Sequence, residues 1–129
     1  MSACGDRSQY YDTLATLLGA GLPILRALEQ HYPGRFNRVA RQLRESLQGG
    51  STLAEAMRGM SCFSSFECNV AAAGEYSGQL DRCFRSLSDW FALRQRLRQK
   101  SAGIIAEHFR KSPLAHHRFN HQRGPYQGG

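Results

Sequence analysis

The sequence predicts an all-α protein. Its apolar residues recur at spacings of three and four along most of the chain, which is the period of one face of a helix. No stretch of four to eight residues alternates strictly between apolar and polar, as a half-buried strand would. Of the 129 residues, 41% are hydrophobic and 21% are charged, which is typical of globular proteins. A single domain with one hydrophobic core is therefore expected.

The first two helices are expected before Pro33. The hydroxyl of Ser8 can cap a first helix, which ends at the glycine cluster of residues 19–21. Pro23 has a fixed φ and lacks an amide donor, so it suits the first turn of a second helix. That helix reaches about Glu29 and stops before Pro33, because the residue ahead of a proline avoids helical geometry.

The third helix is expected from about Arg35 to Gln48, where an apolar stripe leads up to Gly49. Arginines follow at steps of three on the opposite face: Arg35, Arg38, Arg41 and Arg44. They could bind an acidic partner, or they could form an ordinary solvated helix face. Ser51 or Thr52 then caps a short fourth helix, which has Glu55 in its first turn, where the helix dipole favours an acid.

Two further helices are expected to meet at a turn that contains glycine. The fifth covers residues 66–73, and Gly74 is expected to end it in the left-handed conformation. Ser77 can then cap the sixth helix, whose apolar stripe begins at Leu80 and brings Trp90 into the core. The predicted core as a whole comprises Leu14, Leu17, Leu28, Val39, Leu43, Leu53, Phe63, Phe84, Leu87, Trp90 and Phe91.

Charge divides the chain into two parts. Residues 1–93 carry nine Arg and nine acidic residues, whereas residues 94–123 carry six Arg and two Lys against Glu107 alone. A basic run at the start of the second part comprises Arg94, Arg96, Arg98 and Lys100. Each cation near an anionic lipid surface contributes about 1 kcal/mol, so this run could give weak, salt-sensitive membrane contact.

The last residues, 101–129, form a basic, His-rich segment that is predicted to be a flexible tail. Its interleaved aromatic and basic residues could bind nucleic acid without sequence specificity. Nucleic acid is nevertheless a disfavoured partner, because residues 1–93 carry no net charge and offer no recognition helix. The tail histidines do not predict a metal site, since imidazoles in a flexible segment lack supporting hydrogen-bond partners.

The sequence lacks the residue patterns of an enzyme. It contains no nucleophile elbow, phosphate-binding loop or metal-ligand helix, so no catalytic, cofactor or metal site is predicted. The four cysteines form no CxxC pair, which favours reduced thiols. The longest uncharged stretch, residues 13–25, is shorter than the roughly 20 apolar residues of a membrane-spanning helix. With no secretory signal pattern at the N-terminus, a cytoplasmic location is expected.

Three motifs occur in order along the chain. They are LATLLGAGLP over residues 14–23, GSTLAEAM over residues 50–57 and AGEYSGQL over residues 73–80. In order and spacing they resemble the type II secretion system F domain, the cytoplasmic helical domain of the inner-membrane platform protein in type II secretion and type IV pilus machines. The resemblance covers about residues 10–100. Its most specific part is the turn that contains Gly74, Glu75, Ser77 and Gly78.

The resemblance implies a compact bundle of about six helices over residues 8–100, followed by the tail of residues 101–129. It also implies a non-enzymatic hub that docks on the secretion or pilus assembly ATPase and on neighbouring inner-membrane proteins. Family members usually contain two such domains and three membrane helices, whereas this chain is expected to contain one domain and no membrane anchor. The expected location is the cytoplasm, with peripheral attachment to the inner membrane as a further hypothesis.

Two interpretations of Glu75, the acidic residue of the most specific motif, stay open. Its carboxylate could contact a partner or a cation, with Arg35, Arg38 and Arg41 as further parts of the partner surface. Alternatively, it stabilises the N-terminus of the helix that follows it. A homodimer is a further expectation, because the small residues 71–73 and the long final helix could pack on a second copy.

Overall fold

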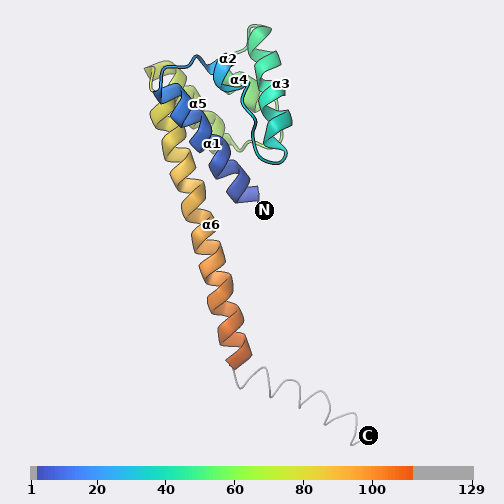
Figure 1. The fold of residues 1–129 in the computed structure, drawn as a ribbon, viewed down its shortest axis with the longest axis vertical. Helices are drawn as coiled ribbons and strands as arrows, with labels where there is room; N and C mark the ends of the chain where they lie inside the picture. The colour runs from blue at the N-terminus through green and yellow to red at the C-terminus, as the bar shows by residue number, and fades with distance from the viewer. Residues whose placement is uncertain (1–2, 112–129) are drawn as a thin grey trace, which may run out of the picture. The chain divides into compact units, whose positions relative to one another are not determined.

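The computed structural model describes residues 3–111, which form six α-helices and contain no strand (Figure 1). The helices are α1 (Ala3–Gly19), α2 (Ile24–Ala27), α3 (Phe36–Gln48), α4 (Leu53–Arg58), α5 (Ser65–Ser77) and α6 (Leu80–Lys111). The predicted all-α class with six helices is confirmed.

The chain divides into two units, which we call the core unit (Met1–Arg94) and the distal unit (Gln95–Gly129). The core unit ends at Arg94, whereas the sequence suggests a domain boundary at residue 100. Residues 101–111, expected in the flexible tail, continue α6, because no proline occurs between the start of this helix at Leu80 and Pro113. The remainder of the predicted tail, residues 112–129, lies outside the described residues.

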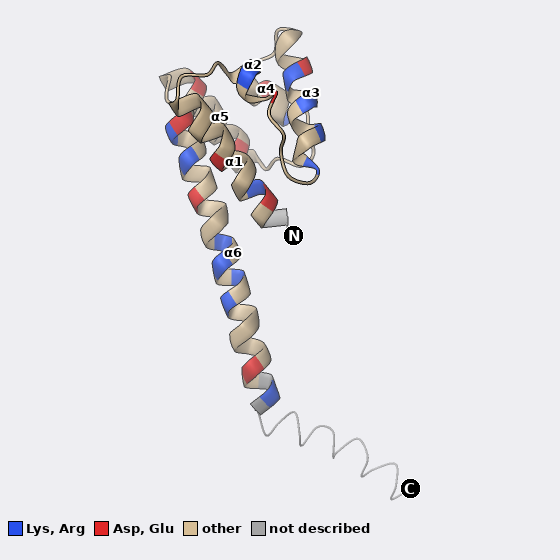
Figure 2. Cartoon of the chain, viewed as in Figure 1, with Lys and Arg blue, Asp and Glu red and all other residues tan. Residues whose placement is uncertain are grey.

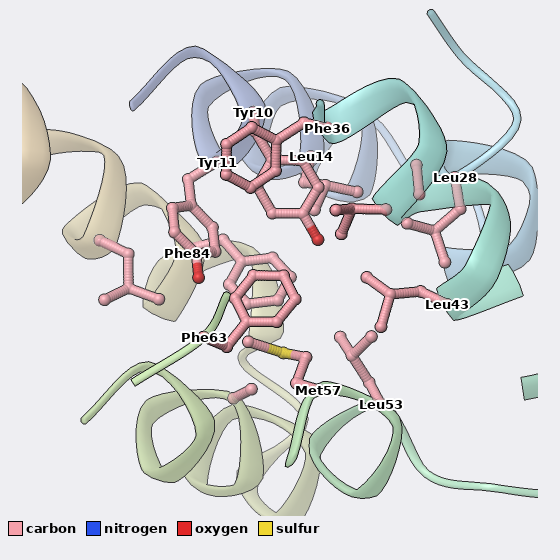
Figure 3. Close-up of a cluster of buried hydrophobic side chains, with 14 of the residues drawn as sticks. Tyr10, Tyr11, Leu14, Leu28, Phe36, Leu43, Leu53, Met57, Phe63 and Phe84 are labelled. Carbon is pink, nitrogen blue, oxygen red and sulfur yellow. The ribbon is translucent and has the colours of Figure 1, made fainter. Parts of the chain in front are cut away.

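All six helices contribute buried side chains to the core unit. Figure 3 shows the centre of this core, with side chains from α1, α3, α4 and α6 pointing toward one another. The largest fully buried side chains are Tyr10, Tyr11, Leu14, Leu28, Tyr32, Phe36, Leu43, Leu53, Met57, Phe84 and Leu87. Tyr10 stacks on Phe36 with ring centroids 4.8 Å apart, and Tyr11 lies 5.3 Å from Phe84. Such ring pairs add to the free energy gained by burial alone. Helix α1 therefore supplies the aromatic centre to which α3 and α6 pack.

The prediction that Trp90 lies in the core is wrong. Its side chain is 43% exposed, whereas Phe84, Leu87 and Phe91 of the same helix are buried. These three residues define one stripe, because a helix turns by about 100° per residue. Trp90 immediately precedes Phe91 and therefore lies on the flank of the stripe, at the surface.

Helix α1 begins at Ala3, so the prediction that Ser8 caps it is wrong. The Ser8 hydroxyl instead donates a hydrogen bond to the backbone oxygen of Ser88 at 3.1 Å. The Ser88 hydroxyl donates in return to the backbone oxygen of Ser8 at 3.0 Å. A small hydroxyl side chain can serve a neighbouring helix as well as its own terminus. This reciprocal pair joins α1 to α6 within the core unit.

Two helices begin with complete capping boxes. At the start of α4, the Thr52 hydroxyl accepts from the Glu55 backbone N–H, and the Glu55 carboxylate accepts from that of Thr52. The cap predicted for this helix is therefore confirmed. Ser64 and Glu67 form the same arrangement at the start of α5, and this second capping box was not predicted.

The predicted end of α5 at Gly74 is wrong, because the helix continues to Ser77 and ends at Gly78 with φ 71°. The Ser77 hydroxyl bonds to the Ala73 backbone oxygen at 2.8 Å, so it does not cap α6. Gly74 instead matters for the close packing of α6 on α5. A Cβ atom there would lie 3.0 Å from the Cα of Leu80, which is tighter than most such contacts in proteins, so Leu80 would have to move slightly away. Gly78 thus makes the turn, and Gly74 lets α6 pack closely on α5.

A buried carboxylate ties α1 to the start of α5. Oε1 of Glu67 accepts from Nη1 of Arg7 at 2.8 Å and from the Tyr11 hydroxyl at 2.7 Å. Oε2 accepts from the Ser64 backbone N–H at 2.8 Å and from the Ser64 hydroxyl at 2.9 Å. Burial, followed by the nearby Tyr10 and Glu67, raises the pKa of Tyr11 far above its ordinary value. The Tyr11 hydroxyl therefore keeps its proton and donates.

The guanidinium of Arg7 also lies among aromatic rings. It is 5.1 Å from the ring centroid of Phe36, 5.6 Å from that of Phe91 and 5.8 Å from that of Phe63. Cations are attracted to the faces of such rings, more strongly where water is excluded. The positive charge of Arg7 is thus balanced by Glu67 of α5, and its guanidinium lies near rings from α3, α6 and the loop before α5.

We expect Glu67→Gln to lower the free energy of unfolding by about 3 kcal/mol, because breaking a buried ion pair leaves Arg7 without its countercharge. Urea unfolding followed by circular dichroism measures the change. Asp12→Asn is the matched control, since it removes the exposed pair with Arg85 and should cost at most about 1 kcal/mol. Equal, small losses in the two variants would show that the Glu67 pair does not hold the fold.

Candidate docking surfaces

The described residues contain several exposed surfaces on which a partner could bind. Among residues 3–111, no group of three or more His, Cys, Asp or Glu side chains could hold a metal ion. Within the same residues, none of the helices combines the length and the apolar character needed to cross a bilayer. Three of the tail histidines and the aromatic residues behind the nucleic-acid alternative fall in residues 112–129, outside the described part.

The outer side of α3 carries the arginines that the sequence places there, and we call it the α3 arginine face (Arg35, Arg38, Arg41 and Arg44). Arg38 and Arg41 are exposed, as is Arg35 just before the helix, and Arg44 is half-buried. The opposite side of the helix is buried through Phe36, Val39, Ala40 and Leu43. Figure 2 shows the resulting basic stretch along α3.

No ion pair within the described residues involves any arginine of this face. Arg35 lies with its guanidinium 5.5 Å from the Phe36 ring centroid, and Glu45 is the one acidic residue of the helix. The positive charges are therefore available to a partner. Within the core unit this is a local feature, because residues 1–93 as a whole carry equal numbers of Arg and acidic residues.

Glu75 lies in the last turn of α5 and reaches the start of α4. Its Oε2 accepts from the backbone N–H of Leu53 at 2.7 Å, and its Oε1 accepts from that of Ala54 at 2.9 Å. The first N–H groups of a helix have no partner inside the helix and favour a negative charge. The stabilised terminus thus belongs to α4, which precedes Glu75 in the chain, and not to α6. No hydrogen bond or ion pair between Glu75 and the α3 arginine face occurs in the described part.

The four residues of the family-motif turn have separate positions in the structure. Gly74 is buried against α6, and Glu75 points to α4. Ser77 is the last residue of α5, and Gly78 is its C-cap. The motif therefore combines a close helix contact, a cap for another helix and a left-handed turn.

The basic run predicted on the final helix is exposed throughout. Arg94 belongs to the core unit, and its guanidinium lies 5.8 Å from the Trp90 ring centroid. The other three residues belong to the distal unit: Arg96, Arg98 and Lys100. Exposed apolar side chains occur in the same part of α6, namely Leu97, Ile104 and Ile105. Basic and apolar groups therefore share the surface of the distal unit.

One further surface of the core unit does not follow from the sequence patterns, and we call it the Trp90 groove. It is an open groove of about 590 Å³ in the core unit, lined by Arg7, Phe63, Phe66, Trp90, Phe91 and Arg94 among others. Phe66 is 52% exposed, and its ring centroid lies 6.3 Å from that of Trp90. The position of Trp90 next to the inward-facing Phe91 is the one signal that could have revealed it.

Comparisons with known proteins agree with the three sequence motifs. The family model for type II secretion system (T2SS) protein F matches residues 10–109. The chain is 36% identical over 99 residues to the type IV pilus assembly protein PilC of Thermus thermophilus, covering 74% of this chain and 24% of that protein. It is 32% identical over 97 residues to the type II secretion system protein F of Xanthomonas campestris pv. campestris, covering 71% and 24%.

A third relative is the type 4 fimbrial assembly protein PilC of Pseudomonas putida, which is 35% identical over 102 residues, covering 74% of this chain and 25% of that protein. The chain thus spans about a quarter of the length of the curated relatives it matches. The matched region contains all of the motifs and nearly the whole helical core. On this match, the chain belongs to the type II secretion system protein F family.

Proposed function

We propose that the core unit is a non-enzymatic docking domain of a type II secretion or type IV pilus assembly platform, and that it binds the assembly ATPase and inner-membrane assembly proteins. The names of the relatives support the setting, since they refer to secretion, pilus assembly and fimbrial assembly. The observation that carries the proposal is the α3 arginine face, whose cations lack acidic partners within the described residues.

Arginine is well suited to such a surface. Its guanidinium stays charged, forms paired hydrogen bonds with carboxylates and is enriched at protein interfaces. A concentrated patch of one sign also steers an oppositely charged partner and speeds association. Because residues 1–93 as a whole carry no net charge, this patch distinguishes one side of the core unit from the rest. We therefore propose that the α3 arginine face binds an acidic surface of the assembly ATPase.

We expect the double variant Arg38→Ala, Arg41→Ala to bind the purified cognate ATPase about tenfold more weakly, since each lost charge pair costs somewhat under 1 kcal/mol. Biolayer interferometry at two salt concentrations measures the loss, which should shrink as salt screens the charges. Arg26→Ala is the matched control, because Arg26 is exposed on α2 and already pairs with Glu29. Unchanged affinity of the double variant would refute the assignment to this face.

For Glu75 we propose that stabilisation of α4 is its role. Glu75→Ala should lower the free energy of unfolding by about 1 kcal/mol, as loss of a helix cap does, because Leu53 and Ala54 lose their acceptor. Thermal unfolding measures this, and ATPase affinity is measured at a temperature where the variant is folded. The affinity should stay at the wild-type value. Lost affinity with an unchanged melting temperature would instead make Glu75 a partner contact.

A second candidate function, weak attachment to an anionic membrane, is favoured by the mixed surface of the distal unit. The exposed Leu97, Ile104 and Ile105 could enter the interfacial region while the basic side chains lie at the lipid headgroups. With about 1 kcal/mol per cation, three cations support reversible binding only. Attachment of this kind would complement ATPase docking rather than replace it.

The triple variant Arg96→Ala, Arg98→Ala, Lys100→Ala should lose most co-sedimentation with phosphatidylserine-containing vesicles, and high salt should release the wild-type protein. The charge-matched control is Arg38→Ala, Arg41→Ala, Arg44→Ala on α3. Binding that persists unchanged in high salt, or equal losses in the two triple variants, would contradict membrane contact through the distal unit.

A further inference from the structure

We propose that the Trp90 groove binds an acidic peptide segment of a partner protein. In this arrangement an apolar side chain of the peptide enters the groove beside Phe66 and Trp90, and a neighbouring carboxylate pairs with Arg94. The groove lies on different helices from the α3 arginine face, so this inference does not depend on the function proposed for that face.

The apolar part of the groove is built by rings at two depths. Phe63 and Phe91 are almost fully buried, with 7% and 6% of their surfaces exposed. Above them, Phe66 and Trp90 meet edge to face and stay about half exposed. Exposed aromatic side chains around a hollow of this size are typical of a binding site, and buried Trp is a frequent anchor of interfaces.

The groove has more positive than available negative charge. Glu67 at its base offers no free oxygen, because each oxygen already accepts from two donors, and its charge is balanced by Arg7. Cys62 adds no negative charge, since burial raises the pKa of its thiol. Arg94 remains, without an acidic partner among the described residues and positioned over the Trp90 ring. The groove therefore presents one uncompensated positive charge beside an apolar hollow.

This combination favours an acidic peptide over other occupants. A lipid surface would suit a flat or convex basic face, whereas the apolar rings here line a hollow of about 590 Å³, large enough for side chains. In a symmetric contact between two copies the same patch lies on both sides. Of the residues that line the groove, each copy would then bring its Arg94 and no free acid, so the lining residues alone would leave the charge unpaired.

Trp90 is the one tryptophan of the 129-residue chain, so its fluorescence reports directly on the groove. The test uses the full chain and an array of short synthetic peptides without Trp or Tyr, in which Glu and Asp flank a central Leu or Phe. These peptides should shift Trp90 emission to the blue and saturate. Counterparts with Lys in place of the acids, or with Ser in place of the apolar residue, should produce no shift.

Paired variants link the signal to the proposed contacts. Arg94→Ala should weaken binding about fivefold, as loss of an exposed ion pair does, and Phe66→Ala about tenfold, as loss of an interface aromatic does. Arg82→Ala and Tyr76→Ala are the controls, since Arg82 is an exposed arginine of α6 and Tyr76 is the 94% exposed aromatic of α5. Both controls should bind like the wild type, as should the double variant Arg38→Ala, Arg41→Ala.

Several outcomes would overturn the inference. They are no saturable shift with any acidic peptide, equal shifts with the lysine counterparts, or wild-type binding by both Arg94→Ala and Phe66→Ala. A shift produced by phosphatidylserine vesicles and not by peptides would assign the groove to lipid. A shift that depends on protein concentration alone would assign it to a second copy of the chain.

Discussion

The carboxylate of Glu67 determines how the first part of the core unit is held together. It accepts hydrogen bonds from the Arg7 guanidinium and the Tyr11 hydroxyl of α1. It also accepts from the backbone N–H and the hydroxyl of Ser64, just ahead of α5. The net free energy of a buried ion pair is small, because desolvation offsets most of the attraction. Its consequence is geometric, because these four hydrogen bonds join α1 to the loop and to the start of α5. Phe63, beside Ser64 in that loop, is thereby fixed under the rings of the Trp90 groove.

Local patterns account for most of the helices. The apolar stripe of α3 and the capping box of Thr52 and Glu55 depend on residues within a few positions of one another, and both can be predicted from the sequence. The end of α5 cannot be predicted from local patterns in the same way. Gly74 and Gly78 are equally able to end a helix, and the structure distinguishes them through Leu80, which packs against Gly74. The local sequence therefore allows the helix to end at either glycine, whereas the packing of α6 on α5 accompanies an end at Gly78.

The parts of the candidate sites that the sequence misses depend on contacts over long separations. Arg7 and Glu67 are 60 positions apart, and no periodicity marks a charged residue as buried. Ser8 meets Ser88 across 80 positions, so its hydroxyl is used between helices and not at a helix start. The α3 arginine face, by contrast, follows from a local pattern, because residues opposite a buried stripe must face solvent. The exposure of the α3 arginines could thus be predicted from the sequence, whereas the Trp90 groove becomes visible only in the folded structure.

The two proposed surfaces differ in what they can contribute to binding. The α3 arginine face carries several unpaired cations and little exposed apolar area, so its attraction acts over a distance of about a Debye length and mainly raises the rate of association. The Trp90 groove has one free cation and a large exposed aromatic pair. Contacts of that kind act only after water is excluded, and they mainly slow dissociation. The two proposed surfaces therefore complement each other, since the first would attract an acidic component quickly and the second would retain an acidic peptide that also carries an apolar side chain.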